Sequence, residues 1–121
     1  MWARYAFAVT VRLDPTRDVS LEPNTFETRM YREAEDPGDP GWRFFRDNLW
    51  RGDLADADHF RTLTEEALGV TVLAVEYRAF ETDESYRDAL RAAIADDLAA
   101  FNADTVDAVL NKYFGSSIEV R

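Results

Sequence analysis

An alternation of large apolar side chains with small or polar ones over residues 4–13 constrains the fold more than any other feature of this chain. A two-residue period predicts a β-strand with one buried and one exposed face. Residues 26–31 alternate in the same way after a proline-containing loop, which predicts a second strand pairing with the first as a hairpin. The expected buried face of the first strand carries Tyr5, Phe7, Val9, Val11 and Leu13.

Helical and strand patterns follow one another along the next part of the chain. Pro40 precedes a predicted helix over residues 42–51, and Asp56 and Gly69 suit the beginning and end of a second helix. Residues 70–80 are rich in β-branched and aromatic side chains and predict a third strand. Its expected inner face carries Leu73, Val75, Tyr77 and Ala79.

Two further helices and a strand complete the predicted order. The first helix begins at Thr82 or Asp83 and carries an apolar stripe from Tyr86 to Phe101. Asp104 is expected to cap the second helix, and residues 116–121 are expected to form the last strand.

The order β-β-α-α-β-α-α-β contains strands separated by helices, and such strands are joined by crossovers that place the helices against the sheet. We therefore predict an α+β fold, a two-layer sandwich in which a four-stranded mixed sheet has helices on one face. At 121 residues the chain is expected to form a single globular domain over residues 1–121.

Arginine supplies almost all of the positive charge. Thirteen arginines and one lysine, Lys112, stand against 24 carboxylates, and the formal net charge is −10. Guanidinium groups are weakly hydrated and pair well with carboxylates, and an acidic surface keeps a protein soluble in concentrated salt. No apolar run approaches the ~20 residues that cross a bilayer. The composition therefore predicts a halophilic, cytoplasmic protein that does not enter a membrane.

Catalytic patterns are not recognisable in the sequence. The only histidine, His59, follows Asp56 and could serve as a general base, but Asp56 is better placed as a helix cap. The adjacent acidic pairs Glu65-Glu66 and Asp96-Asp97 point about 100° apart on a helix and do not converge on one ion. No cysteine is present to serve as a ligand or nucleophile. We expect no cofactor and favour a protein that is not an enzyme, with an acidic site near His59 left as an alternative.

The densest aromatic and arginine-rich stretch covers residues 41–51. Tryptophan and arginine are enriched at binding hot spots because they combine contact area with forked hydrogen bonding. The alternative is that Trp50 packs on the helix that begins at Asp56, while the arginines pair with local carboxylates. The candidate interaction surface consists of Arg43, Arg46, Trp50 and Arg51.

A second candidate surface is the sheet face away from the helices, where three strands repeat the pattern Glu-x-Arg. This face could form a solvated ladder of ion pairs, or it could dock a second copy of the chain or an anionic partner. Tyr31 and Phe80 fall in the same phase and could stack a base. The residues of this surface are Arg4, Arg12, Arg29, Tyr31, Arg78, Phe80 and Arg121.

Residues 44–52, which contain Leu49-Trp50-Arg51, resemble a family of small haloarchaeal proteins, the LWR-salt proteins. The similarity runs along the whole chain and includes residues 25–28 and the ending at 112–118. The resemblance implies an archaeal cytoplasm rich in salt, and it implies no activity, cofactor or catalytic residue.

The function that we expect from the sequence is a non-enzymatic module that engages a protein partner or a second copy of itself. The alternative is a nucleic-acid- or ribosome-associated factor that uses the open sheet face. Molar salt shortens the Debye length to about 3 Å and weakens binding to phosphates steeply, which favours a protein partner over nucleic acid.

Overall fold

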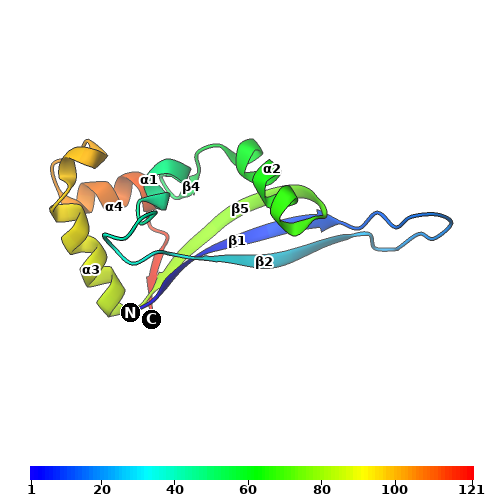
Figure 1. The fold of residues 1–121 in the computed structure, drawn as a ribbon, viewed down its shortest axis with the longest axis horizontal. Helices are drawn as coiled ribbons and strands as arrows, with labels where there is room; N and C mark the ends of the chain where they lie inside the picture. The colour runs from blue at the N-terminus through cyan, green and yellow to red at the C-terminus, as the bar shows by residue number, and fades with distance from the viewer.

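A four-stranded sheet with the strand order β2-β1-β5-β6 organises the structure, a computed structural model that describes residues 1–121 (Figure 1). Strand β1 pairs antiparallel with β2 and with β5, whereas β6 pairs parallel with β5. The predicted mixed, four-stranded sheet is therefore confirmed. The strands are β1 (Ala3–Arg12), β2 (Thr25–Glu33), β5 (Thr71–Thr82) and β6 (Ile118–Val120).

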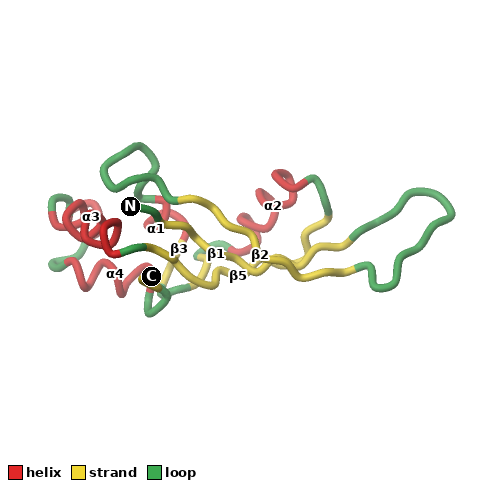
Figure 2. The backbone as a smooth tube through the Cα atoms, turned by 90° about the horizontal axis from the view of Figure 1, so that it is seen from below, coloured by secondary structure: helices red, strands yellow, loops and turns green.

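The helices lie on one side of this sheet (Figure 1), as the sequence predicts. None of them is both long enough and apolar enough to span a membrane. The loop of residues 13–24 between β1 and β2 extends away from the rest of the molecule in both views (Figures 1 and 2). The helices are α1 (Phe44–Asn48), α2 (Ala57–Leu68), α3 (Glu84–Ala95), the 3-10 helix η1 (Leu98–Phe101) and α4 (Val106–Phe114).

The predicted helix over residues 42–51 is too long at both ends, and its last residues form a strand. Helix α1 ends at Asn48, and the chain then forms a short hairpin of β3 (Leu49–Trp50) and β4 (Asp53–Leu54). The helical spacing of the large side chains is real, but contacts that the hairpin makes with α4 decide the backbone conformation of residues 49–54.

Strand β5 carries two irregularities that the sequence pattern does not reveal. Its register against β1 shifts twice, at Leu73 and at Arg78, each of which is an extra residue opposite β1. Such a bulge reverses the side-chain alternation. Phe80 consequently turns into the core, where 1% of it is exposed, and Ala79 turns to the open face. The prediction that Ala79 lies on the inner face and Phe80 on the open face is therefore wrong.

The helix caps follow the sequence closely. Asp56 accepts a hydrogen bond from the backbone N–H of His59 at 3.1 Å and begins α2, and Asp83 accepts one from Tyr86 at 2.8 Å and begins α3. Helix α4 is capped by Thr105 rather than by Asp104. The long helix predicted from residue 86 to residue 101 is divided, because α3 ends at Ala95 and η1 follows.

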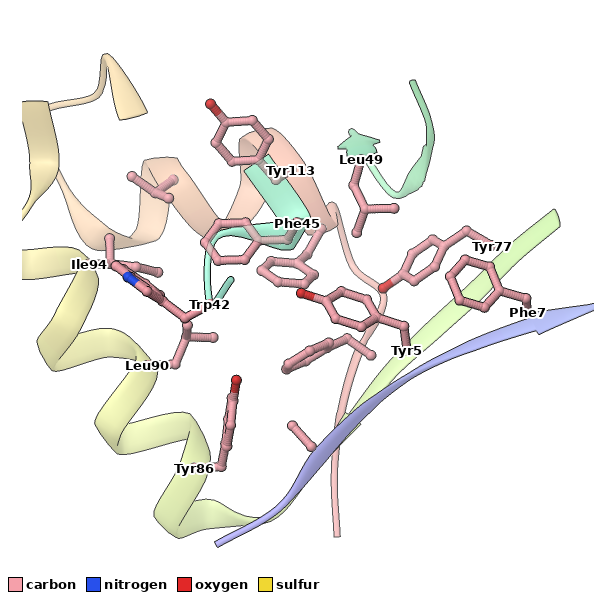
Figure 3. Close-up of a cluster of buried hydrophobic side chains, with 14 of the residues drawn as sticks. Tyr5, Phe7, Trp42, Phe45, Leu49, Tyr77, Tyr86, Leu90, Ile94 and Tyr113 are labelled. Atoms are coloured by element: carbon pink, nitrogen blue, oxygen red, sulfur yellow. The ribbon is translucent and has the colours of Figure 1, made fainter. Parts of the chain in front are cut away.

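The core is aromatic and lies where α1, α3 and α4 meet one end of the sheet (Figure 3). Phe45 is its central side chain, with ring centroids of Phe114 and Phe101 at 4.8 and 5.6 Å. Burial raises the pKa of Tyr77 and Tyr86 above the ordinary value of 10.0, so both phenols stay protonated. They serve as hydrogen-bonding groups within the core, and Tyr86 donates to the carbonyl of Glu35 at 2.6 Å.

Candidate functional site

A two-residue turn at Arg51 and Gly52 joins β3 to β4, with Trp50 opposite Asp53. Both turn residues have left-handed backbone conformations, with φ of 52° and 84°. This is the pattern of a type I′ turn, in which asparagine followed by glycine is the favoured pair. Arginine is an uncommon choice in this conformation, because its Cβ crowds the following carbonyl.

The turn lies directly against the end of α4. The N–H of Arg51 donates to the carbonyl of Lys112 at 2.8 Å, and the N–H of Gly52 donates to that of Tyr113 at 2.9 Å. These carbonyls belong to the last turn of α4, which has no partners for them within the helix. A Cβ at Gly52 would lie 3.0 Å from the carbonyl oxygen of Phe114, so only glycine fits this approach.

Leu49 and Trp50 point in opposite directions from this hairpin. Leu49 points into the aromatic core (Figure 3), and 1% of it is exposed. Trp50 is 46% exposed and packs one edge against Tyr113, with ring centroids 6.3 Å apart. The predicted alternative, Trp50 packed on the helix that begins at Asp56, is therefore replaced by packing on α4.

Two cations lie beside the Trp50 indole. The guanidinium of Arg51 is 5.6 Å from the ring centroid, and the ammonium of Lys112 is 5.9 Å from it. Ten of the thirteen arginines have a carboxylate oxygen within 4.0 Å. Arg51 and Lys112 have none, so positive charge stays uncompensated around Trp50 in a chain with a net charge of −10.

Two shallow grooves of about 630 and 670 Å³ meet at Trp50, Arg51 and Lys112. Arg46 lines the first groove together with Asp53, and Asp104 lines the second. We call Arg46, Trp50, Arg51 and Lys112 the Trp50 surface. Lys112 was not among the residues predicted for this surface, although it is the only lysine in the chain, which is an unusual feature.

The residues that shape this hairpin are those that carry the family resemblance, and the model of the LWR-salt protein family matches residues 1–121. The chain belongs to the LWR-salt protein family. Neither the comparison with curated proteins nor the comparison with solved structures gave a match. In this LWR-salt protein the two most specific segments of the resemblance, residues 48–52 and 112–118, pack against each other through the hydrogen bonds of the turn.

Arg43 lies apart from the Trp50 surface, although the sequence grouped them. Its guanidinium pairs with Asp97 and lies 4.8 Å from the centroid of the Trp42 ring, and it lines neither groove. Arg46 does line a groove but also pairs with Asp47 at 3.1 Å. Arg43 therefore connects the start of α1 to the segment before η1 through its pair with Asp97.

The open sheet face of this LWR-salt protein contains an ion-pair network. Glu81 is nearly buried, and its two carboxylate oxygens accept from Arg4 at 2.8 Å and from Arg121 at 3.1 Å. Arg12 pairs with Asp14 at 2.9 Å. These arginines are neutralised within the chain, which fits the solvated-ladder interpretation better than an anion-binding face.

The Glu-x-Arg repeats on this face behave differently from strand to strand. In β2, Glu27 and Arg29 have no ion-pair partner, and each side chain is exposed. The other two repeats form ion pairs within their strands: Glu76 with Arg78 at 2.8 Å, and Glu119 with Arg121 at 3.4 Å.

The predicted base-stacking platform is not formed. Phe80 is buried in the core through the bulge at Arg78, whereas Tyr31 lies on the opposite, open face. The guanidinium of Arg4 covers the Tyr31 ring at 3.9 Å from its centroid. Two adjacent exposed rings are what open-sheet RNA binders use to stack bases, and this face offers one ring that is already covered.

His59 lies exposed in the first turn of α2, where its backbone N–H serves the Asp56 cap. It lines neither of the two grooves that meet at Trp50. The structure brings together no group of three His, Cys, Asp or Glu side chains that could hold a metal ion.

Proposed function

We propose that this LWR-salt protein is a non-enzymatic interaction module that binds an acidic segment of a protein partner at the Trp50 surface. The observation that carries the proposal is the half-exposed indole of Trp50 between two cations that lack carboxylate partners. Most other cations of the chain are already paired, so these two are available to an incoming carboxylate.

The chemistry of the Trp50 surface suits a peptide with acidic and apolar side chains. An indole supplies contact area, and a guanidinium supplies forked hydrogen bonds that match a carboxylate. The grooves on either side of Trp50 give an extended segment two places to lie.

The backbone of Arg51 supports a role for its side chain. Its φ of 52° is strained for arginine, and asparagine or glycine would relieve that strain. An arginine at this position is explained if the guanidinium itself makes a contact with the partner.

We propose further that the module works in a salt-rich, haloarchaeal cytoplasm. Support comes from the thirteen arginines to one lysine and from the 24 carboxylates. In molar salt the attraction between distant charges is screened, so affinity has to rest on burial of the indole and on direct contacts.

The test is affinity capture of the tagged chain from a lysate of its source cells kept in molar KCl. We expect a specific protein that the unmodified chain recovers and that Trp50→Ala and Arg51→Asn each lose. The matched controls are Trp2→Ala and Arg87→Asn, which remove another exposed tryptophan and another surface arginine.

The controls are expected to recover that protein as the unmodified chain does. The proposal is wrong if Trp50→Ala recovers the same proteins as the unmodified chain, or if the unmodified chain recovers none. Material that nuclease releases from the captured chain would instead support the nucleic-acid alternative.

A further inference from the structure

Strand β2 is a long edge strand with nothing paired on its outer side. It is the outermost strand of the sheet, nine residues long, and pairs with β1 in a continuous register without a bulge. Eight of its nine residues are exposed. It contains no proline, which is a common device for blocking an edge strand from further pairing.

The hydrogen bonds of the β1–β2 hairpin fix which backbone groups of β2 point outward. The N–H of Leu13 donates to the carbonyl of Asn24, and the N–H of Ala34 donates to that of Ala3. Hydrogen-bonded pairs alternate along an antiparallel ladder, so the even-numbered residues of β2 use their backbone groups on β1. The odd-numbered residues, from Thr25 to Glu33, present unpaired N–H and C=O groups at the free edge.

We propose that two copies of this chain associate through their β2 strands, paired antiparallel about Thr28, to form one continuous eight-stranded sheet. In this register Glu27 of each copy faces Arg29 of the other on the open face. Phe26 of each copy faces Met30 of the other on the helix side, and Thr28 faces Thr28. The proposal goes beyond the binding function of the Trp50 surface, because it uses a different element of the fold.

Three features of the free chain point to this register. Glu27 and Arg29 have no ion-pair partner, although the equivalent residues of β5 and β6 pair within their strands. Phe26 is 43% exposed, and the second copy would cover it with Met30. Opposite charges and apolar pairs that face each other across an antiparallel ladder are stabilising.

Neighbouring registers are much less favourable. Moving the partner by two residues in either direction places Arg29 opposite Arg29 or Glu27 opposite Glu27, and like charges directly opposite each other are destabilising. Moving it by one residue places outward-pointing backbone groups opposite inward-pointing ones, so the ladder cannot form. In the register about Thr28, opposite charges face each other and the outward-pointing backbone groups of the two strands are aligned.

Concentrated salt does not remove the basis of this association. Roughly eight backbone hydrogen bonds would join the two strands. These bonds and the contact between Phe26 and Met30 depend little on ionic strength, whereas the Glu27–Arg29 pairs chiefly select the register.

The first test measures molar mass by light scattering in molar KCl. The unmodified chain is expected at about twice 13.9 kDa. Glu27→Arg alone and Arg29→Glu alone each place like charges opposite each other, so each variant is expected to be largely monomeric. The double variant Glu27→Arg/Arg29→Glu restores opposite charges and is expected to be dimeric.

Mixing the two single variants gives a sharper result, because the copy with two arginines then faces the copy with two glutamates. We expect the mixture to form a heterodimer, which also shows that each single variant is folded. A monomeric unmodified chain, or single variants that dimerise as well as the unmodified chain, would overturn the proposal.

The second test uses the absence of cysteine from the chain. Residues 28 of the two copies form a non-hydrogen-bonded pair, with Cα atoms about 4.5 Å apart, which is within the range that a disulfide bridges. Thr28→Cys is therefore expected to cross-link into a covalent dimer on mild oxidation. Thr25→Cys, on the same strand but facing Tyr31 of the other copy, is expected to remain uncross-linked. A dimer in which Thr28→Cys fails to cross-link would show that another surface joins the copies.

Discussion

At the scale of single residues, Arg51 stands where the backbone geometry favours asparagine or glycine. A left-handed conformation costs an L-residue with a Cβ roughly 1–2 kcal/mol, and asparagine tolerates it better. We expect Arg51→Asn to raise the free energy of unfolding by roughly 0.5–1 kcal/mol, because the hairpin and its hydrogen bonds to α4 are kept. Urea unfolding at a fixed KCl concentration measures this change.

Substitution of the neighbouring residue, Gly52, is expected to lower the stability and serves as a control. Gly52→Ala places a Cβ at 3.0 Å from the carbonyl oxygen of Phe114 in a left-handed backbone. We expect a loss of roughly 2 kcal/mol from strain and from a weaker contact with α4. A stabilised Arg51→Asn that also loses the captured partner would separate the binding role of Arg51 from its effect on the fold. A destabilised Arg51→Asn would contradict this account of the turn.

Asp83 makes stability depend on pH in the acid range. The backbone N–H of Tyr86 is the main cause that lowers the pKa of this carboxylate from its ordinary value of 3.8, and the N–H of Trp2 adds to the effect. Since the pKa is lower in the folded chain, the contribution of Asp83 is fully present above about pH 3.8. It is lost as the pH falls through the lowered value.

Asp83→Asn keeps an acceptor for the cap of α3 and removes the ionisable group. We expect its urea midpoint to fall less than that of the unmodified chain between pH 5 and pH 2. Glu84→Gln, which removes a carboxylate from the same helix turn without touching the cap, is the matched control. If the urea midpoints of Asp83→Asn and the unmodified chain fall in parallel with pH, protonation of Asp83 does not contribute to the loss of stability in acid.

At the scale of elements, the sequence predicted the strands and helix ends that depend on interactions between residues close together in the chain. The strand predicted over residues 4–13, the caps at Asp56 and Asp83 and the stop at Gly69 were found, although the strand ends at Arg12 and Leu13 is exposed. Several predicted segments were wrong, and at residues 49–52 a distant contact overrides the local pattern. Residues 49–52 leave the helix to reach the carbonyls of α4, some sixty residues further along the chain.

In the candidate site, too, neighbours in the chain were predicted together and contacts between distant residues were not. The sequence grouped Arg46, Trp50 and Arg51 because they are close in the chain, and the structure brings them to one groove. Lys112 joins them only through the fold, and Arg43 leaves them because Asp97 holds it elsewhere. Pairings between distant residues have no periodicity by which a single sequence could reveal them.

The bulge at Arg78 is the element that decides which aromatic ring enters the core. A regular alternation running from Tyr77 through Arg78 without a bulge would place Phe80 on the open face. Phe80 is in ring contact with Tyr5 and Phe114, with centroids 4.9 Å apart in each case. Deleting Arg78 removes the bulge but leaves Tyr77, Ala79 and Phe80 in regular alternation, so we expect Phe80 to stay in the core and the cost to stay well below the roughly 3–5 kcal/mol of Phe80→Ala.

Arg78→Ala keeps the bulge and removes only an exposed ion pair with Glu76, so we expect it to cost less than about 1 kcal/mol. Urea unfolding compares the two variants, and near-ultraviolet circular dichroism reports the packing of the aromatic core. A deletion variant that loses as much stability as Phe80→Ala would show that the bulge itself, and not only the phase of Phe80, is needed for this packing.

At the scale of the whole molecule, the surface combines paired arginines with excess carboxylate. Ten arginines are compensated, yet thirteen of the 24 carboxylates have no cation within 4.0 Å. The unpaired carboxylates repel one another in the folded chain, and this repulsion falls when salt screens it. We therefore expect the free energy of unfolding to depend on ionic strength as well as on the hydrophobic core.

We expect the chain to unfold, or to lose much of its thermal stability, when KCl is removed at pH 7, and to regain its fold when molar KCl is restored. Thermal unfolding followed by circular dichroism over a series of KCl concentrations measures this. The control is the same series near pH 4.5, the isoelectric point, where net repulsion is small and low concentrations of KCl should have little effect. A transition temperature at pH 7 that does not depend on KCl would contradict the assignment of carboxylate repulsion as the destabilising term. A KCl dependence that is equally strong at both pH values would identify stronger burial of apolar surface in salt as the cause instead.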